Sequence, residues 1–459
     1  MTFTLRPYQM DLIDQARAKI GSGIRSTLLV APTGAGKTAL AAFMLGSASS
    51  KGKRCWFMVH RRELITQSSK TFQKVGIRHG IISAGFTEQR QELVQIAGIQ
   101  SLRNRLQNMP PPDMIIWDEC HHVASQSWSD IFSLYPDIVH VGLTATPCRL
   151  DGRGLGDWFS VMVEGPTTAW LIEQGFLSPY KLYAPSTPDL DGLKSRGGDY
   201  VTADLADRMD RPALTGDVIS HYRKLCHGKR AIVFAANIQH SLHVVEQFRD
   251  AGYTAEHLDG KTDRIRRDQV LQDFEAGSVQ VVSNVDLFGE GFDLPAIEAV
   301  ILLRPTQSTG LYLQQVGRSL RTSEGKTHAV ILDHAGNALR HGLPDQIRDW
   351  NLDAKPQTKR QRETDAPPIK QCMTCYAVHA PAPVCPVCGH VYEVKGRTVE
   401  QVEGELVELS AEMMLRAKKR EQSSAKTLDD LITLATARKY KNPTAWAKHV
   451  QKARISKNG

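Results

Sequence analysis

The segment Ala31–Thr38 constrains the fold of this chain more than any other feature. It reads Ala-Pro-Thr-Gly-Ala-Gly-Lys-Thr, follows an apolar run and precedes a helical pattern. Glycines in such a turn let backbone N–H groups converge on phosphate oxygens, an approach that side chains would block. The sequence therefore predicts a phosphate-binding loop, with Lys37 at the β- and γ-phosphates and Thr38 on Mg²⁺. The residues expected around the phosphates are Thr33, Gly34, Ala35, Gly36, Lys37 and Thr38.

On both sides of this loop, short β-rich apolar runs alternate with amphipathic stretches, the pattern of a parallel α/β sheet. One series of runs extends from Thr27 to Leu143 and a second from Ala231 to Leu332. The expected fold is α/β, with two parallel-sheet domains in tandem, then a small cysteine module and a helical tail. The expected boundaries are 1–178 and 213–352 for the two domains, 179–212 for a connector, 353–369 for a linker, 370–394 for the cysteine module and 395–459 for the tail.

Two carboxylates follow the expected strand Met114–Trp117. Asp118 and Glu119 at a strand end suit a second half of the nucleotide site, with Asp118 on Mg²⁺ and Glu119 activating the attacking water. An acidic pair alone is usually a solvated loop, but the upstream phosphate loop reverses that balance. The adjacent His121 and His122 cannot share one helical face, which excludes a metalloprotease site.

Further motifs occur in the order of the superfamily 2 helicases of the DEAD/DEAH type, which the chain resembles from Leu5 to Arg321. That resemblance implies two RecA-like domains, ATP as the nucleotide, and contacts of Arg6 and Gln9 with the adenine. The matching segments are Arg6–Gln9, Val59–Leu64, Gly98–Leu102, Asp118–His121, Thr144–Pro147, Ala231–Ala235, Gly289–Asp293 and Gln314–Arg321.

The resemblance also assigns roles within these motifs. Arg318 and Arg321 would stabilise charge on the transferred phosphoryl group, and both are expected on one helix, one turn apart. Because they lie far from Lys37 in sequence, hydrolysis would require the two domains to close over ATP. The remaining assignments are Gly291 and Asp293 for ATP binding and Thr144, Thr146 and Gln314 for coupling hydrolysis to movement. Surface ion pairing is the alternative for the two arginines.

A nucleic-acid single strand is expected across both domains, held by backbone contacts without base reading. A solvated helix start is the alternative for Arg61 and Arg62. The candidate contact residues are His60, Arg61, Arg62, Gln100, Asn237, Asp259, Gly260 and Thr262.

The net charge of +8 is concentrated at one end. Residues 410–459 hold 12 Lys or Arg and 4 Asp or Glu, so the rest of the chain is formally neutral. This imbalance favours a polyanion partner for the tail, with a solvated helix face as the alternative. The preference for DNA over RNA rests on the family resemblance and not on charge. Trp446 and Tyr440 among these basic residues fit a nucleic-acid grip, although Trp446 serves equally well as the core of a small helical pair.

Two C-x-x-C pairs, Cys372–Cys375 and Cys385–Cys388, predict a metal site. Four thiolates at this spacing form a closed tetrahedral set typical of structural zinc, with iron or redox thiols as alternatives. We expect this segment to fold as a zinc ribbon, in which the metal holds together a segment too short for its own core. Chelation is then expected to unfold the ribbon and leave basal ATPase largely intact. The ribbon or the tail would contact replication or repair proteins.

Composition excludes other classes of protein. The chain has 459 residues, about three domains, and 41% hydrophobic residues, which excludes a largely disordered protein. Apolar runs are far below the ~20 residues of a membrane span, and no signal peptide is visible. The expected location is the cytoplasm of a bacterial or phage-infected cell, with no membrane partner.

Two functions remain open on the sequence alone. One is a helicase or translocase in DNA replication, recombination or repair. Within superfamily 2, the chain resembles most the RadD-like repair ATPases of bacteria and phages. That similarity is carried by Asn284–Val285 with Gly291–Pro295, Leu303–Thr306, Leu332–Asn337 and the cysteine segment. The other is an ATP-gated clamp that remodels protein–DNA complexes without separating strands. A metabolic kinase explains neither the arginine motif nor the ribbon.

Overall fold

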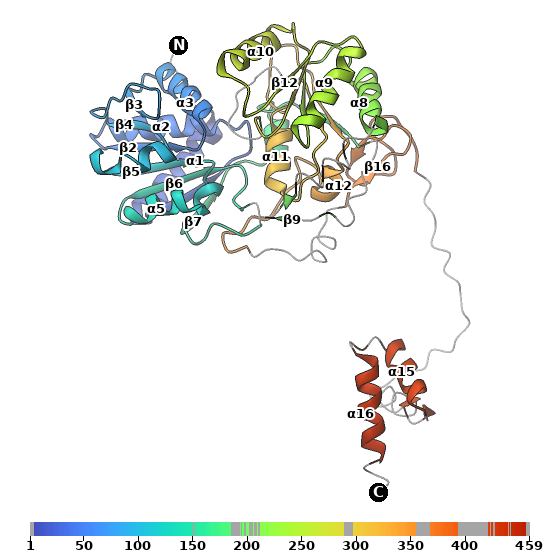
Figure 1. Ribbon diagram of the computed structural model, residues 1–459. Coiled ribbons are helices and arrows are strands. Elements are labelled where there is room, and N and C mark those ends of the chain that lie inside the picture. The colour runs from blue at the N-terminus through green and yellow to red at the C-terminus, as the bar shows by residue number, and fades with distance from the viewer. Residues whose placement is uncertain are drawn as a thin grey trace. The chain divides into compact units, whose positions relative to one another are not determined.

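The chain divides into two compact units in the computed structural model. The first, residues 1–392, holds both α/β domains and the cysteine module, and the second, residues 393–459, holds the helical tail (Figure 1). In the part of the chain that is described, no helix is long and apolar enough to cross a bilayer. The described residues are 4–149, 152–184, 193, 195–196, 199–201, 205, 209, 212–288, 297–354, 368–392, 421–422, 424–425, 427–438, 440 and 442–455.

The first lobe is a parallel sheet with helices on both faces. In spatial order its strands are β3 His79–Ile82, β4 Val94–Gly98, β2 Cys55–Val59, β5 Met114–Asp118, β6 Val139–Thr144, β1 Ser26–Val30 and β7 Val161–Glu164. Its helices are α1 Pro7–Gly21, α2 Lys37–Ser49, α3 Arg62–Lys74, α4 Ile99–Arg103, α5 Gln126–Leu134 and α6 Thr168–Glu173, with 3₁₀ turns at Leu106–Asn108 and Cys120–Ala124.

The second lobe repeats this design. Its parallel strands are, in spatial order, β12 Ala255–Leu258, β13 Val281–Asn284, β11 Ala231–Phe234, β14 Ala299–Leu302, β15 Ala329–Asp333 and β8 Tyr180–Tyr183. Its helices are α8 Pro212–Leu225, α9 Ile238–Asp250, α10 Arg264–Ala276, α11 Thr309–Gly317 and α12 Asn337–His341. The fold class expected from the sequence, two tandem parallel α/β domains, is therefore confirmed.

Burial on both faces explains why these strands are continuous apolar runs. In β2, Phe57 packs into a core cluster on one face, while Trp56 and Met58 pack into a second cluster on the other. In β14, Val300 and Ile301 likewise belong to different clusters. Parallel sheets covered on both faces select such runs in place of an alternating pattern.

One strand lies where the sequence analysis expected a connector. β8 pairs in parallel with β15 and forms an edge of the second sheet. The Gly, Pro and Asp residues downstream favoured a connector over the whole of 179–212, although Tyr180–Tyr183 is a β-rich run. Within the same segment, β9 Ser195–Arg196 and β10 Asp199–Tyr200 form a short antiparallel pair.

A second difference concerns the end of the second domain, expected at residue 352. Trp350 and Leu352 pack against the core of the first lobe. Backbone N–H groups of Gly154 and Gly156 donate to the carbonyls of Ala354 and Leu352, each at 2.9 Å. The segment 350–354 therefore belongs to the first lobe, a long-range contact that periodicity cannot reveal.

The cysteine module is attached to the second lobe. Its strands β16 Lys370–Gln371 and β17 Val378–His379 pair with each other. The backbone N–H of Ala184, just after β8, donates to the carbonyl of Tyr376 at 3.0 Å, and Tyr183 forms a bridge with Ala377. The module therefore covers the edge strand β8, which would otherwise expose unpaired backbone groups.

The tail forms a helix pair in its described part. α15 Leu428–Ala437 begins with a capping box between Thr427 and Asp430, and α16 Pro443–Ile455 packs against it. Leu431, Ala447 and Val450 lie in its buried core together with Ala425, and Trp446 is partly buried against this core. Trp446 therefore contacts the core of the helix pair, and its contact with nucleic acid stays a prediction.

Candidate nucleotide site and metal centre

The phosphate loop joins β1 to α2. Gly34 has φ 90° and Gly36 has φ 83°, in the left-handed region that favours glycine. Gly36 is the N-cap of α2 and Lys37 is its first residue, so the free N–H groups of the first helical turn face the loop. The loop therefore has the form of an anion cradle at a helix N-terminus.

The start of α1 braces this cradle. The side chains of Tyr8 and Gln9 both donate to the backbone carbonyl of Ala35 at 2.9 Å. The side-chain oxygen Oε1 of Gln9 accepts from the backbone N–H of Arg6 at 2.9 Å. A Cβ on Gly36 would lie 2.5 Å from Gln9 Nε2, so the contact requires glycine there. Arg6 and Gln9 thus lie beside the loop, and their contact with adenine stays a prediction.

The two carboxylates lie at the end of β5, opposite the lysine of the loop. Lys37 Nζ is 3.5 Å from Glu119 Oε1, and both side chains are about 10% exposed. Burial and the neighbouring Glu119 carboxylate raise the pKa of Asp118, while Lys37 opposes this shift. Crowded buried carboxylates of this kind fit a divalent cation, and Asp118 with Thr38 are the expected Mg²⁺ ligands. Glu119 has φ 48°, which holds its side chain in an unusual direction.

His121 is a site residue that the sequence analysis missed. Its Nδ1 lies 3.6 Å from Glu119 Oε2 and 3.4 Å from the hydroxyl of Thr144. The Thr144 hydroxyl also donates to the carbonyl of Thr146 at 2.9 Å. His121 therefore connects the expected catalytic base to the coupling residues. It is the fourth residue of the Asp-Glu-Cys-His motif, and its place in that motif could have identified it from the sequence. The third letter, Cys120, packs in the core.

The second lobe meets the phosphate loop through α11 and the turn that follows. A Cβ on Gly317 would lie 2.6 Å from the Cβ of Thr33, and a Cβ on Gly34 would lie 3.5 Å from the Cγ of Arg321. A Cβ on Gly310, earlier on α11, would lie 2.9 Å from the Thr146 hydroxyl oxygen. The phosphate loop and the end of α11, nearly 300 residues apart in sequence, are therefore in contact at the anion cradle. Gln314 is buried on α11.

Close approach at Gly317 gives a first prediction. Gly317→Ala should force the lobes apart at Thr33 and cost about 1–3 kcal/mol of closure free energy, as overpacking does. We expect ATP hydrolysis to fall about tenfold, measured by phosphate release, with no change in the melting temperature of either lobe. Gly21→Ala is the matched control, because nothing lies within 4 Å of its Cβ position. Unchanged hydrolysis in Gly317→Ala would mean that the lobes need not touch here.

The helix expected to carry both arginines is shorter than predicted. α11 ends at Gly317, so Arg318 is its C-cap and Arg321 lies in the turn beyond it. The single-helix arrangement of Arg318 and Arg321 is therefore wrong. Helical periodicity continued through Leu320, but the chain turns after Gly317 to follow the phosphate loop.

Lys326 holds this turn and was also missed by the sequence analysis. Its Nζ donates to the carbonyls of Ser319, Ile297 and Arg321, the last two at 2.9 and 2.7 Å. Burial lowers the pKa of Lys326 to about 8. A cation at the end of a helix satisfies carbonyls that would lack partners, so Lys326 fixes the backbone that carries Arg321. Nothing in the local sequence distinguishes it from a surface lysine.

The candidate nucleic-acid residues follow the carboxyl ends of parallel strands in both lobes. Gln100 is exposed at the start of α4, while Asn237 caps α9 by accepting from His240 N at 2.8 Å. His60 lies against the ring of His122, with centroids 4.5 Å apart, so its side chain packs beside the acidic pair. Arg62 is exposed and lies over the Phe86 ring.

Asp259 organises the turn that contains Gly260 and Thr262. Its Oδ1 accepts from the backbone N–H groups of Lys261 and Thr262, both at 2.9 Å, and from the Thr262 hydroxyl. Gly260 is exposed at the tip of this turn. Gly291 and Asp293, expected at the ATP, lie outside the described residues.

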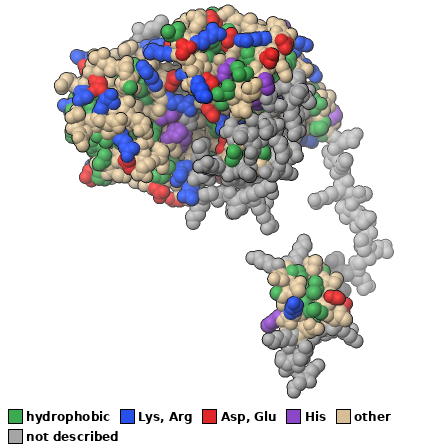
Figure 2. Space-filling model, in the orientation of Figure 1, with side chains coloured by type: hydrophobic (Ala, Val, Ile, Leu, Met, Phe, Trp, Pro, Cys, Tyr) green, Lys and Arg blue, Asp and Glu red, His purple; other side chains and the backbone are tan. Residues whose placement is uncertain are grey.

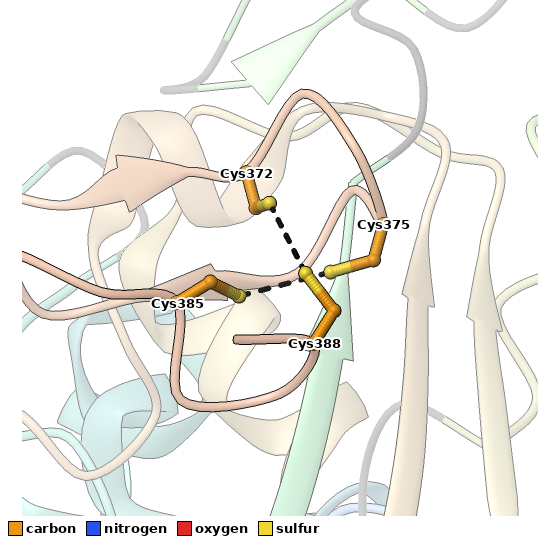
Figure 3. Close-up of side chains that lie close together, drawn as sticks. All are labelled: Cys372, Cys375, Cys385 and Cys388. Atoms are coloured by element: carbon orange, nitrogen blue, oxygen red, sulfur yellow. Dashed lines mark hydrogen bonds between the residues drawn. The ribbon is translucent and has the colours of Figure 1, made fainter. Parts of the chain in front are cut away.

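The four cysteines of the module converge on one point (Figure 3). The sulfurs of Cys372 and Cys388 are 3.7 Å apart, those of Cys375 and Cys385 are 3.8 Å apart, and all four lie within 4.8 Å of one another. A tetrahedral zinc ion with Zn–S bonds of about 2.3 Å holds its sulfurs about 3.8 Å apart. The donor set therefore fits a structural tetrathiolate metal site.

Two of these cysteines are part of the second lobe's core. Cys372 and Cys385 are buried in the cluster that includes Val233, Val281 and Ile301. The sequence analysis treated the module as separate from the catalytic lobes because a linker precedes it. The packing contradicts that separation.

Comparison with known proteins accounts for both lobes. Residues 2–149 match the family described as type III restriction enzyme, res subunit, and residues 217–323 match the helicase conserved C-terminal domain. A 51.5 kDa protein of a Lactococcus phage (isolate 7-9) is 34% identical over 80% of this chain and 78% of its own length. The Saccharomyces cerevisiae protein IRC3 is 28% identical over 72% of this chain, which spans only about half (51%) of it.

Two further similarities concern proteins whose names include DNA. The protein named DNA 3'-5' translocase XPB2 of Sulfurisphaera tokodaii is 25% identical over 73% of this chain and 82% of that protein. Among solved structures, the ATP-dependent type ISP restriction-modification enzyme LlaBIII bound to DNA has a TM-score of 0.56 at 19% identity, covering 72% of this chain and 28% of that one. The paired lobes, the motifs on them and these matches agree: the chain belongs to the superfamily 2 helicases.

Proposed function

We propose that this protein uses ATP hydrolysis to move along DNA or to separate its strands, in replication, recombination or repair. One observation carries the proposal: Gly317 and Arg321 of the second lobe lie against the phosphate loop of the first. Charge that develops on a transferred phosphoryl group could then be stabilised from both lobes, so hydrolysis would depend on lobe closure.

Each residue of the site has a distinct role in this proposal. Lys37 and the N–H groups of the loop hold the phosphates, and Glu119 takes a proton from the attacking water. Thr38 and Asp118 hold Mg²⁺, which supplies Lewis-acid charge neutralisation when it is bound. Arg318 and Arg321 stabilise the transition state, and Thr144, Thr146 and Gln314 pass the change to the second lobe. His121 orients the Glu119 carboxylate and links it to the Thr144 hydroxyl.

DNA is the proposed nucleic acid because the matched family and two similar proteins have names that refer to DNA or to restriction. We further propose zinc at the four cysteines, on the sulfur spacing, and membership of the RadD-like repair group, on the cysteine module after the second lobe. Replication or repair proteins would be contacted through the module or the tail.

Side-by-side ATPase rates with single-stranded DNA, duplex DNA, forked DNA and RNA test this proposal. We expect DNA to stimulate hydrolysis more than RNA, and a tailed or forked duplex to be separated in an ATP-dependent way. Hydrolysis that is stimulated by DNA without strand separation or translocation on any substrate would favour the ATP-gated clamp. Stimulation by RNA alone would overturn the choice of DNA.

The charge distribution gives a second prediction. Lys and Arg are interspersed with Asp and Glu on the face seen in Figure 2, in keeping with the neutrality of residues 1–409. A variant that ends at residue 409 should therefore have a smaller slope of log affinity for DNA against log salt, since each neutralised phosphate contributes about 0.9 to that slope. Fluorescence anisotropy with a labelled strand measures it. An identical slope would show that the tail does not contact the phosphates.

A further inference from the structure

Arg61 and Glu63, at the start of α3, both contact the second lobe. Arg61, the N-cap of α3, donates from Nη1 to the carbonyls of Asp286 and Leu287 at 2.9 and 3.1 Å. Asp286 has φ 52°, and its carboxylate pairs with Arg304 of the same lobe. The guanidinium expected on the nucleic-acid strand therefore binds backbone of the opposite lobe.

Two residues further on, a side-chain ion pair crosses between the lobes. Glu63, in the first turn of α3, accepts from Nη1 of Arg267 in the first turn of α10. The Arg267 side chain is 12% exposed and that of Glu63 is 33% exposed. Because the pair is partly shielded from water and salt, it contributes more than an exposed surface pair does.

The same arginine also holds the turn that carries the candidate strand contacts. Arg267 Nη2 donates to the carbonyls of Asp259 and Thr262, at 3.2 and 3.1 Å. A planar guanidinium can bind the carboxylate with one edge and the two carbonyls with another, which a lysine cannot do. The position of the turn 259–262 is therefore linked, through one side chain, to whether Glu63 of the other lobe is in place.

We propose that Arg267 is a positioning residue that couples lobe closure to the grip on nucleic acid. When the lobes close, Glu63 fixes Arg267, which fixes the carbonyl side of the 259–262 turn and presents its exposed tip at Gly260 to the strand. When they open, the turn loses this support and its hold on the strand weakens. This inference rests on the proposed function, since it assigns a mechanism to the same nucleic-acid track.

A double-mutant cycle tests the coupling. Glu63→Gln and Arg267→Gln should each raise the concentration of oligo(dT) that half-activates the ATPase by about tenfold, within the usual range of coupling between sites. The double variant should be no worse than the poorer single variant. The hydrolysis rate at saturating oligo(dT) should stay at the wild-type value, because neither residue touches the nucleotide site and the saturating strand drives the lobes closed. A merely destabilising substitution would not separate the two quantities in this way.

Glu256→Gln is the matched control. Glu256 pairs with Arg266, next to Arg267, at 2.8 Å, but it does so within the second lobe. Its half-activating concentration should equal that of the wild type. Single variants that behave like Glu256→Gln, or a double variant in which the two losses multiply, would overturn the coupling.

A second readout separates this inference from the proposed function. Fluorescence energy transfer between dyes on the two lobes, with ADP and beryllium fluoride and no nucleic acid, reports closure directly. We expect Glu63→Gln to lower the closed fraction and Glu256→Gln to leave it unchanged. If no nucleic acid stimulates the ATPase, the proposed function and the positioning of the turn are both refuted. If Glu63→Gln still lowers the closed fraction in that case, Glu63–Arg267 remains a closure contact. An unchanged closed fraction would remove that contact as well.

Discussion

Glu119→Gln should reduce ATP hydrolysis by about 10²- to 10⁴-fold, the range of general-base contributions, while ATP binding is retained. The amide keeps the size of the side chain and its place beside Lys37 and His121, but it cannot accept a proton from water at neutral pH. Single-turnover phosphate release, together with binding of a fluorescent ATP analogue, separates the two effects. Multiple turnovers at the wild-type rate would show that another group is the base.

Lys37→Ala should also abolish hydrolysis, and in addition it should weaken ATP binding because the ammonium that faces the phosphates is lost. Lys53→Ala is its control: Lys53 pairs with Asp113, and its side chain is 58% exposed. Loss of hydrolysis in Lys53→Ala as well would point to general instability of the first lobe instead of the phosphate site.

Removal of the metal should destabilise the second lobe, not the cysteine module alone. Loss of a structural metal belongs to the largest class of single-site effects, about 4 kcal/mol or more, which corresponds to a fall of about 10 °C in melting temperature. Cys385→Ser, or chelation at neutral pH, should therefore lower basal ATPase together with the melting temperature and the bound metal content. This replaces the expectation that basal ATPase would remain largely intact.

Cys226→Ser is the control for this experiment. Cys226 lies in the same core cluster as Cys385 and is also 1% exposed, but it is not one of the four converging cysteines. It should lose some stability by burying a hydroxyl, with no loss of metal. Chelation that releases the metal without any change in melting temperature or ATPase would show that the second lobe stands without it.

The sequence predicts local features well because each depends on neighbouring residues. The strand–loop–helix around Lys37 follows from apolar runs and two glycines, and the four cysteines follow from their spacing. In each case the chemistry needs groups that are close in sequence, so a short segment is sufficient to recognise it.

Features that depend on distant partners could not be predicted in this way. Arg61 reads as a surface cation until Asp286 is beside it, and Lys326 reads as a surface lysine until the carbonyls of the arginine turn surround it. α11 ends at Gly317, where Thr33 of the other lobe lies against the helix, a contact that helix propensity cannot reveal. His121 differs from these, since the box that contains it was visible in the sequence.

The return of residues 350–354 to the first lobe limits how the lobes can separate. Within the described residues the chain crosses between the lobes near Ser178 and again between His341 and Trp350. Two such tethers oppose free translation of one lobe past the other and leave rotation as the easier movement. Ser178 at the first tether bonds to the backbone of both Leu320 and Arg321, at 2.7 and 3.2 Å. The first crossing is thus joined to the arginine turn itself, so a rotation about this point would move that turn less than the parts of the interface that lie farther from it.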